Sequence, residues 1–291
     1  MKVVITLPAY NEEKSLGPVL EAVKRAMKGS KYRYQLLVLD DGSSDKTAEI
    51  AKKAGAFVYS HKRNLGLAET FKKELELCLK LKADIIVHTD ADGQYPARYI
   101  LQLIQKIEAG YDLVLGSRFE KGHYSGSFLK KIGNKAFAYV FSNLLKTKIT
   151  DTTTGFRAFT KEVAQLPLIN NFTYTQEQLI RAHKGKMHIA EIPITTNRTR
   201  ESRLFKNPFD YAMKAWINIF RIYRDFEPLK FFGLFGGLLF SIGFLLGLYA
   251  LILWIMIDRV GGIPRVILSG VLMLVGIQII LFGFLADMHK K

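Results

Sequence analysis

Short apolar runs alternate with stretches of helical periodicity from Lys2 to about Leu115. This alternation is typical of βαβ units, whose strands form a mostly parallel sheet. The expected strands are Lys2–Leu7, Leu36–Leu39, Phe57–Tyr59, Ile85–Thr89 and Leu113–Leu115. The helices expected between them are Glu13–Lys28, Lys46–Ala54, Leu67–Leu81 and Tyr99–Glu108. The pattern therefore predicts an α/β domain with a doubly wound, Rossmann-like sheet.

The second half of the chain is less regular. A basic, glycine-bearing loop from Ser117 to Gly126 precedes a helix-like stretch from Phe128 to Leu145. A helix is expected from Thr175 to Lys184 and a strand from His188 to Ile194. The segment Asn207–Phe226 carries aromatic residues on one side and basic residues on the other, which is typical of a helix at a membrane surface. A helix that packs against the sheet would show a similar pattern.

Two long segments near the C-terminus contain no charged residue. They are Phe231–Ile257 and Val266–Ala286, joined by the short polar turn Asp258–Arg265. About 20 apolar residues suffice for a helix to cross a bilayer. The sequence therefore predicts a two-helix transmembrane hairpin.

These patterns divide the chain into three parts. We expect a catalytic domain over residues 1–205, a juxtamembrane helical segment over 206–228, and a membrane region over 229–291 with spans at about 231–257 and 264–286. The start of the chain lacks the long apolar run of a secretory signal. We therefore expect the catalytic domain and, because two spans return the chain to the same side, both termini in the cytosol.

The formal net charge of +16 admits two kinds of anionic partner. A basic face can bind nucleic acid, but the sequence shows no recognised nucleic-acid motif. Basic residues beside a membrane span are instead attracted to acidic headgroups, and we expect a lipid bilayer and not nucleic acid as the partner. The single cysteine, Cys78, excludes an internal disulfide and a multi-cysteine metal site.

Polar residues follow several of the expected strands, at the edge where sheets of this kind bind ligands. Asp90 and Asp92 come directly after one strand, and Asp40 and Asp41 after another. Paired carboxylates suit Mg²⁺ or Mn²⁺, although Asp92 followed by Gly93 also favours a plain turn. Asp40 is a candidate for binding a nucleobase or ribose.

Six ordered motifs carry a resemblance to a known family. They are PAYNE at Pro8–Glu12, DDGSSDKT at Asp40–Thr47, NLGLAET at Asn64–Thr70, DADGQYP at Asp90–Pro96, GSR at Gly116–Arg118 and DTTTGFR at Asp151–Arg157. Together they resemble family 2 glycosyltransferases of the GT-A fold, and most of all the polyprenyl-phosphate subgroup that includes dolichyl-phosphate mannose and glucose synthases.

The resemblance implies three sets of site residues. Nucleotide-sugar binding would fall on Pro8, Tyr10, Glu12, Asp40, Gly66, Asp90, Ala91 and Asp92. The metal, Mg²⁺ or Mn²⁺, would be held by Asp90, Asp92 and Gln94. Acceptor-phosphate binding would fall on Arg118, Lys131, Arg157, Arg200, Ser202 and Arg203, of which the last three depart from the motif of the mannose synthases. Catalytic roles would fall on Asp92, Arg118 and Asp151.

The activity implied is transfer of a hexose, such as mannose, glucose or an N-acetylhexosamine, with inversion. The donor would be a GDP- or UDP-sugar and the acceptor a polyprenyl phosphate of the dolichyl type, at the cytosolic face of the membrane. The alternative is a hydroxyl acceptor on a glycolipid or lipid-linked saccharide, for which Asp151 would serve as the base. Asp151 would otherwise be a hydrogen-bonding residue of a turn. The QxxRW motif of processive family members is absent, which disfavours a polymerase.

Overall fold

The computed structural model describes residues 1–119, 142, 149–169, 174–197, 217, 220–221, 223–257 and 262–288. The chain forms two compact units, Met1–Tyr211 and Ala212–Lys291, here called the N-terminal and C-terminal units.

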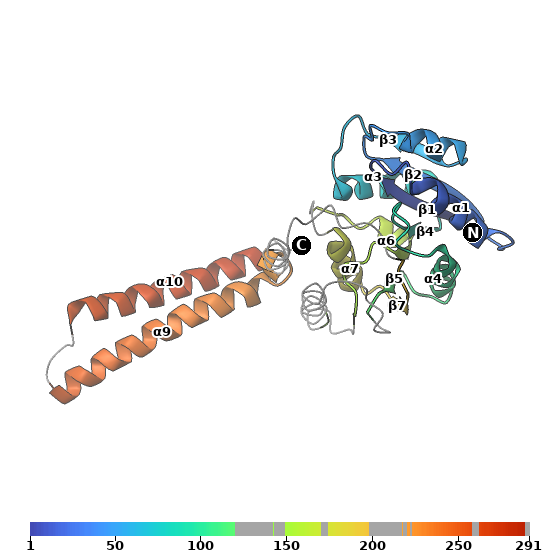
Figure 1. Cartoon of the computed structure of the whole chain (residues 1–291). Helices are drawn as coiled ribbons and strands as arrows, with labels where there is room; N and C mark the ends of the chain where they lie inside the picture. The colour runs from blue at the N-terminus through green and yellow to red at the C-terminus, as the bar shows by residue number, and fades with distance from the viewer. Residues whose placement is uncertain are drawn as a thin grey trace. The chain divides into compact units, whose positions relative to one another are not determined.

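A seven-stranded sheet in the order β3-β2-β1-β4-β6-β5-β7 forms the centre of the N-terminal unit (Figure 1). The strands are β1 (Lys2–Ala9), β2 (Arg33–Asp40), β3 (Phe57–Ser60), β4 (Ile85–His88), β5 (Leu113–Ser117), β6 (Arg157–Thr160) and β7 (Ile189–Pro193). All pairings are parallel except that β6 runs antiparallel to both of its neighbours, β4 and β5. The expected mixed, mostly parallel sheet is thus confirmed.

Strand β6 is the one element of the sheet that the sequence pattern did not predict. It has four residues and begins on a charged one, Arg157, so it shows neither a long apolar run nor a clear alternation. Hydrogen bonding to β4 on one side and β5 on the other, and not the local sequence, therefore determines that these residues form a strand.

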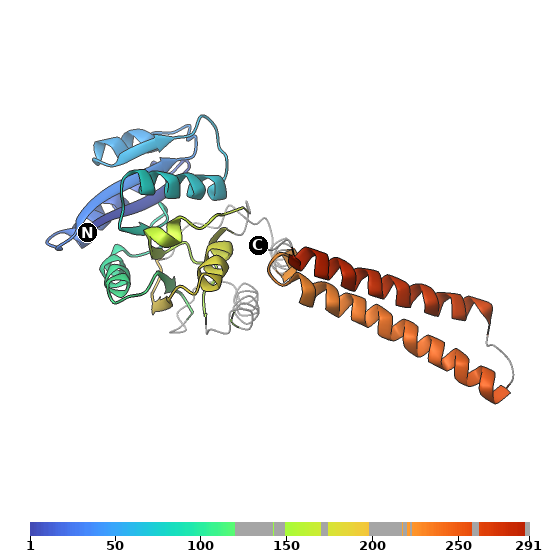
Figure 2. The same cartoon turned by 180° about the vertical axis from the view of Figure 1, so that it is seen from behind.

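Helices cover both faces of this sheet. They are α1 (Leu16–Met27), α2 (Thr47–Lys53), α3 (Leu67–Lys80), α4 (Ile100–Glu108), α6 (Lys161–Ala164) and α7 (Tyr174–Lys184), with a 3₁₀ turn at Ala97–Tyr99 before α4. Helices α1, α2 and α4 contribute to one apolar core with alternate residues of β1 such as Ile5 and Leu7. Helix α3 lies on the other face of the sheet (Figure 2). Its Phe71 packs against Phe159 of β6 and Tyr174 of α7.

The C-terminal unit contains two long apolar helices, α9 (Pro228–Ile257) and α10 (Ile263–Met288), which lie side by side as a hairpin (Figures 1 and 2). Both are long and apolar enough to cross a membrane. Their outward side chains include Leu234 and Met256, which are 70% and 77% exposed. An apolar surface of this extent is unfavourable in water and fits a lipid surrounding. The expected hairpin is confirmed.

Small residues lie where the two helices meet. A Cβ atom added to Gly276 would be 2.7 Å from the carbonyl oxygen of Gly236, and one added to Gly243 would be 2.8 Å from the carbonyl oxygen of Ser269. The backbones therefore approach each other directly. Association of membrane helices depends on such close packing, because lipid tails are as apolar as the side chains themselves.

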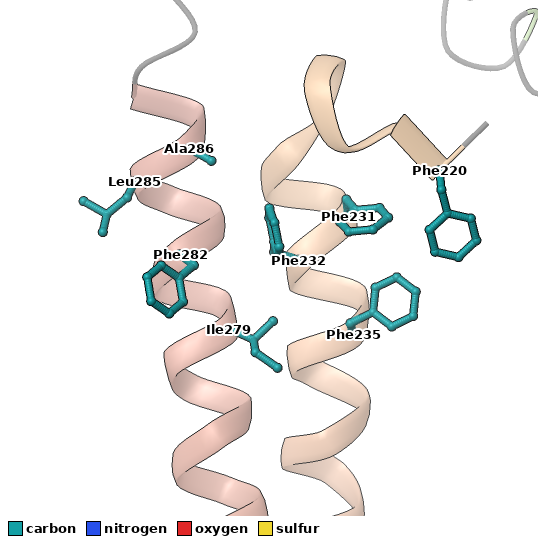
Figure 3. Close-up of a pocket in the computed structure, with 8 residues that line it drawn as sticks. All are labelled: Phe220, Phe231, Phe232, Phe235, Ile279, Phe282, Leu285 and Ala286. Carbon is teal, nitrogen blue, oxygen red and sulfur yellow. The ribbon is translucent and has the colours of Figure 1, made fainter. Parts of the chain in front are cut away.

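An aromatic groove of about 620 Å³ lies at the end of the hairpin where α9 begins and α10 ends (Figure 3). Its lining is Phe220, Phe231, Phe232, Phe235, Ile279, Phe282, Leu285 and Ala286. The rings of Phe231 and Phe235 lie 5.6 and 6.0 Å from that of Phe220, measured between centroids. The lining is almost wholly apolar, so the groove suits hydrocarbon.

Replacement of Gly276 by Val is expected to separate the two helices, because the new side chain would overlap the backbone of α9. Overpacking of this kind costs about 1–3 kcal/mol. Thermal unfolding of the detergent-solubilised chain should show a lower midpoint for Gly276→Val. Gly270→Val on the same helix is the matched control, since a Cβ there meets nothing within 4 Å. Equal midpoints for the two variants would contradict the packing described here.

Candidate functional site

Three strand ends meet at one edge of the sheet. Strand pairing sets Ala9 of β1 opposite Asp40 of β2, and Thr6 of β1 opposite His88 of β4. The chain leaves β1 and β2 at the same level and leaves β4 three residues earlier, at the same edge of the sheet. The segments after β1, β2 and β4 are therefore neighbours. Ligands of doubly wound sheets bind at this carboxyl edge.

The segments after β1 and β2 hold each other through hydrogen bonds. Asn11, with a left-handed φ of 54°, receives a hydrogen bond on Oδ1 from the Ser44 amide at 2.9 Å. The Asn11 amide donates to Ser43 Oγ at 2.9 Å, and the Glu12 amide donates to Thr47 Oγ1 at 2.8 Å. The two loops therefore form one preorganised surface.

Five residues of the expected nucleotide-sugar site lie on this surface or directly beneath it. Asp40 is buried and accepts a hydrogen bond from the Ser43 amide at 3.0 Å. Pro8, Glu12 and Ala91 are also buried, whereas Tyr10 is 41% exposed. Tyr10 is thus the member of this group that offers most surface to a ligand.

Asp41 fixes the loop that leads into α3. Its Oδ1 atom lies 2.8 Å from His61 Nδ1 and accepts the Leu65 amide at 2.9 Å, while Oδ2 accepts the Gly66 amide at 2.9 Å. Gly66, with a φ of 90°, is the residue before α3. The loop holding Gly66 is thereby tied to the end of β2. This role of Asp41 was not predictable from the sequence, because two of its three partners are backbone amides.

The acidic segment after β4 carries the candidate metal ligands. Asp92 Oδ1 accepts the Gln94 amide at 2.9 Å. The pKa of Asp90 is raised to about 6, chiefly by burial; the negative charges of Asp92 and Glu74 contribute to the rise, whereas His88 and Arg118 oppose it. Asp92 also lines a polar cavity of about 400 Å³. The rest of its lining is Asn11, Glu12, Glu13, Lys14, Ser15 and Asp45.

These residues fit a divalent cation. Two carboxylates close enough to affect each other's ionisation favour a cation between them. Within the described ranges no three His, Cys, Asp or Glu side chains form a metal-type group. An ion here would therefore rely on Asp90, Asp92, the Gln94 oxygen and ligands from outside the chain. Mg²⁺ is commonly bound in this way, through one or two carboxylates and substrate phosphates.

Arg118, the residue after β5, forms a two-point ion pair with Asp151. Its Nε and Nη2 atoms lie 2.6 and 2.9 Å from the two carboxylate oxygens, and Nη2 also donates to Thr153 Oγ1 at 2.8 Å. Asp151 is 1% exposed. The carboxylate is therefore occupied with holding the guanidinium, which favours the structural interpretation of Asp151 over that of a base.

Glu191 of β7 holds the segment Thr150–Asp151 in place through hydrogen bonds. Its carboxylate accepts the Asp151 amide at 2.9 Å, the Thr150 amide at 2.9 Å and Thr150 Oγ1 at 2.8 Å. Burial raises the pKa of Glu191. Sequence reasoning missed this residue, because one acidic position in a short strand carries no motif.

Arg157 does not lie where the sequence placed it. It was expected at the acceptor phosphate, but it is the first residue of β6 and is fully buried. Its guanidinium donates to the Thr175 carbonyl at 3.0 Å, to Gln178 Oε1 at 3.1 Å and to the Thr154 carbonyl. Burial lowers its pKa to about 10. Arg157 thus joins β6 to α7, and the geometry does not favour direct contact with an acceptor.

Four expected acceptor residues, Lys131, Arg200, Ser202 and Arg203, lie outside the described residues. Asn197, three residues before Arg200, nevertheless contacts the acidic segment. Its backbone amide donates to the Gln94 carbonyl at 2.9 Å and its side-chain Nδ2 donates to the Gly93 carbonyl at 3.0 Å.

The model of the glycosyl transferase family 2 domain matches residues 4–166. The chain belongs to glycosyl transferase family 2. It is 35% identical over 208 residues to a dolichyl-phosphate hexose transferase of Haloferax volcanii, covering 70% of this chain and 86% of the relative. It is also 29% identical over 256 residues to the UDP-N-acetylglucosamine–dolichyl-phosphate N-acetylglucosaminyltransferase of Methanococcus voltae, covering 78% and 96% of the two chains.

Solved structures confirm the fold of this family 2 enzyme. Glucosyl-3-phosphoglycerate synthase from Mycobacterium tuberculosis, in complex with Mn²⁺, UDP-glucose and phosphoglyceric acid, superposes with a TM-score of 0.60. The match covers 75% of this chain and 79% of the synthase at 20% identity. The structural match shows a GT-A sheet, and membership of glycosyl transferase family 2 makes the chain an enzyme that transfers a sugar.

Gly155→Ala is expected to displace the Asp90 carboxylate while leaving the fold intact. A Cβ atom at Gly155 would lie 2.9 Å from Asp90 Oδ1, which is the movable end of a side chain. Small misplacements of reacting groups can cost up to about a hundredfold in rate, and sugar transfer should fall about tenfold or more at an unchanged unfolding midpoint. Gly185→Ala is the control, because its nearest atoms would be 3.4 Å away. Wild-type turnover in Gly155→Ala would show that the reaction does not depend on the position of the Asp90 carboxylate, contrary to the prediction.

Proposed function

We propose that this family 2 enzyme transfers a hexose from a GDP- or UDP-sugar to a polyprenyl phosphate, with inversion, at the cytosolic face of a membrane. One observation carries the proposal. Arg118, which is paired with Asp151, lies near enough to Asp90 for its positive charge to lower the pKa of that carboxyl, so an anion-binding group adjoins a candidate cation site. The two apolar helices of the same chain suit an acceptor that resides in lipid.

The donor half of the site is the surface formed by the segments after β1, β2 and β4. Asp40 and Tyr10 would meet the nucleoside, and Gly66 would allow close approach of the loop that Asp41 anchors. Asp90, Asp92 and Gln94 would hold the divalent ion, Mg²⁺ or Mn²⁺. A bound ion of this kind neutralises the diphosphate leaving group as a Lewis acid. Mn²⁺ and UDP-glucose together in the complex of the mycobacterial synthase support this assignment.

The acceptor half depends on Arg118. A phosphomonoester has a second pKa of about 6, so the attacking oxygen is already largely deprotonated at neutral pH and needs no strong base. It needs instead to be brought beside a second anion, which a guanidinium does through its paired donors. Asp151 and Glu191 hold Arg118 for this purpose. The names of the Haloferax and Methanococcus relatives, both dolichyl-phosphate transferases, support a lipid phosphate as acceptor.

The membrane region would keep the site at the headgroup plane. We propose the division into a catalytic domain over residues 1–205, a juxtamembrane segment over 206–228 and a membrane region over 229–291, with the catalytic domain and both termini in the cytosol. Support for membrane residence comes from α9 and α10. The aromatic groove at the end of this hairpin is suited to lie among lipid chains.

The reaction is tested by transfer of labelled sugar from a panel of GDP- and UDP-sugars to a short polyprenyl phosphate. We expect label in the lipid phase with Mg²⁺ or Mn²⁺ and none with EDTA. Asp92→Asn should abolish transfer, because it removes one of the two carboxylates proposed to hold the ion, while the protein stays folded and membrane-bound. Undiminished transfer with EDTA would refute the metal requirement.

The kind of acceptor is tested by Asp151→Asn and Arg118→Lys. Loss of activity in Asp151→Asn alone does not identify a base, since the same change releases Arg118. For a phosphate acceptor, both variants should raise the KM for polyprenyl phosphate about tenfold or more, in line with about 1.5–3 kcal/mol for a charged hydrogen bond. A loss confined to kcat in Asp151→Asn, with the KM for polyprenyl phosphate of wild type, would contradict the role of Asp151 in holding Arg118 for the phosphate. Transfer to a lipid-linked hydroxyl acceptor but not to polyprenyl phosphate would favour the hydroxyl alternative.

A further inference from the structure

A carboxylate and an imidazole lie buried beneath the acidic segment, and no step of the proposed reaction uses them. Glu74 of α3 and His88, the last residue of β4, are both 0% exposed. The His88 Nδ1 atom lies 2.9 Å from Glu74 Oε2 and 3.1 Å from Thr6 Oγ1 of β1. The ring of Phe71 meets the His88 ring edge-on at 4.8 Å between centroids. His88 is thus held from both α3 and β1.

This pair is costly for the stability of the domain. Both Glu74 oxygens, His88 Nε2 and Thr70 Oγ1 are buried without an aligned hydrogen-bond partner in the part of the chain that the structure describes. Burial of a carboxylate costs several kcal/mol even when it is paired, and apolar residues of similar volume are often as stable or more stable. Fold stability alone therefore does not explain why the chain has Glu74 and His88 at these positions.

The position of His88 suggests what the pair does. His88 ends β4, the Thr89 amide donates to the Thr6 carbonyl at 3.0 Å, and Asp90 follows at once. The contacts of His88 with Glu74 and Thr6 therefore fix the chain two residues before the first candidate metal ligand. Residues behind metal ligands commonly orient them, and their loss typically lowers metal affinity about 10–100-fold. An apolar pair would fill the space but would not impose a direction on the end of the strand.

We propose that Glu74 and His88 are positioning residues for the divalent-cation site. Their contacts with each other and with Thr6 of β1 hold the end of β4 in place, so that Asp90 and Asp92 can bind one ion. This inference rests on the proposed function, because it assumes that the acidic segment binds a metal.

The test compares metal affinity with stability in the full-length chain in detergent. The double variant Glu74→Met, His88→Leu replaces the pair by apolar residues of similar volume. We expect an unfolding midpoint equal to or above that of wild type, together with Mn²⁺ affinity lowered about tenfold or more. Mn²⁺ binding is followed by electron paramagnetic resonance with Mn²⁺ alone. A purely structural pair would leave the affinity unchanged, and that result overturns the proposal.

Two further variants keep the outcome interpretable. Cys78→Ala, one turn further along α3 and fully buried, should lower the midpoint but leave Mn²⁺ affinity as in wild type. An equal loss of affinity in Cys78→Ala would refute a specific role of the pair. If the double variant does not fold, Glu74→Gln serves in its place and must lower Mn²⁺ affinity for the proposal to stand. Failure of the wild-type chain itself to bind Mn²⁺ would refute the metal assignment of the proposed function and this inference with it.

Discussion

The parallel pairing of β1 with β2 and β4 is the constraint on which the rest of the site depends. Because Ala9 is paired with Asp40 and Thr6 with His88, the chain leaves three strands at one edge. The segments after β1 and β2 are then within hydrogen-bond distance of each other, as Asn11 and Ser44 show, and Asp92 after β4 lines one cavity with Asn11. A slip of one residue in any of these pairings would reverse the direction of every side chain on that strand, and the acidic segment would lose its place.

A second layer of polar contacts supports the residues proposed to meet the substrates. Glu191 holds Asp151, which in turn holds Arg118. Asp41 similarly holds the loop with Gly66. These supporting groups are buried or half-buried acids whose partners are mainly backbone amides or a single guanidinium. Preorganised polar groups of this kind lower the reorganisation needed during a reaction, which explains why a transferase with little covalent chemistry of its own carries so many of them.

The sequence predicted those features that depend on local pattern. Strand β1, helix α1 and the hairpin α9–α10 follow from apolar periodicity, and the motif around Asp90 followed from its position after a strand. Contacts between distant residues were not predictable in this way. Glu191 is 41 residues from Thr150 in the chain, and His88 is 82 residues from Thr6. Arg157 is the clearest failure, since an arginine in a conspicuous motif suggested surface chemistry, whereas a four-residue strand carries it into the interior.

The reversed direction of β6 has a consequence for how substrate preference can change. An antiparallel strand begins at the edge where its parallel neighbours end, so the chain just before Arg157 arrives beside the chain just after His88. Under the proposed function, the two substrates would be bound by separate stretches of one polypeptide, β1 to β4 for the donor and the segment ahead of β6 for the acceptor. Evolution or design can change much of the second stretch without disturbing the first, provided that Gly155 is kept, because a side chain there would displace Asp90. Relatives that share a sugar-nucleotide half could in this way diverge in what they glycosylate.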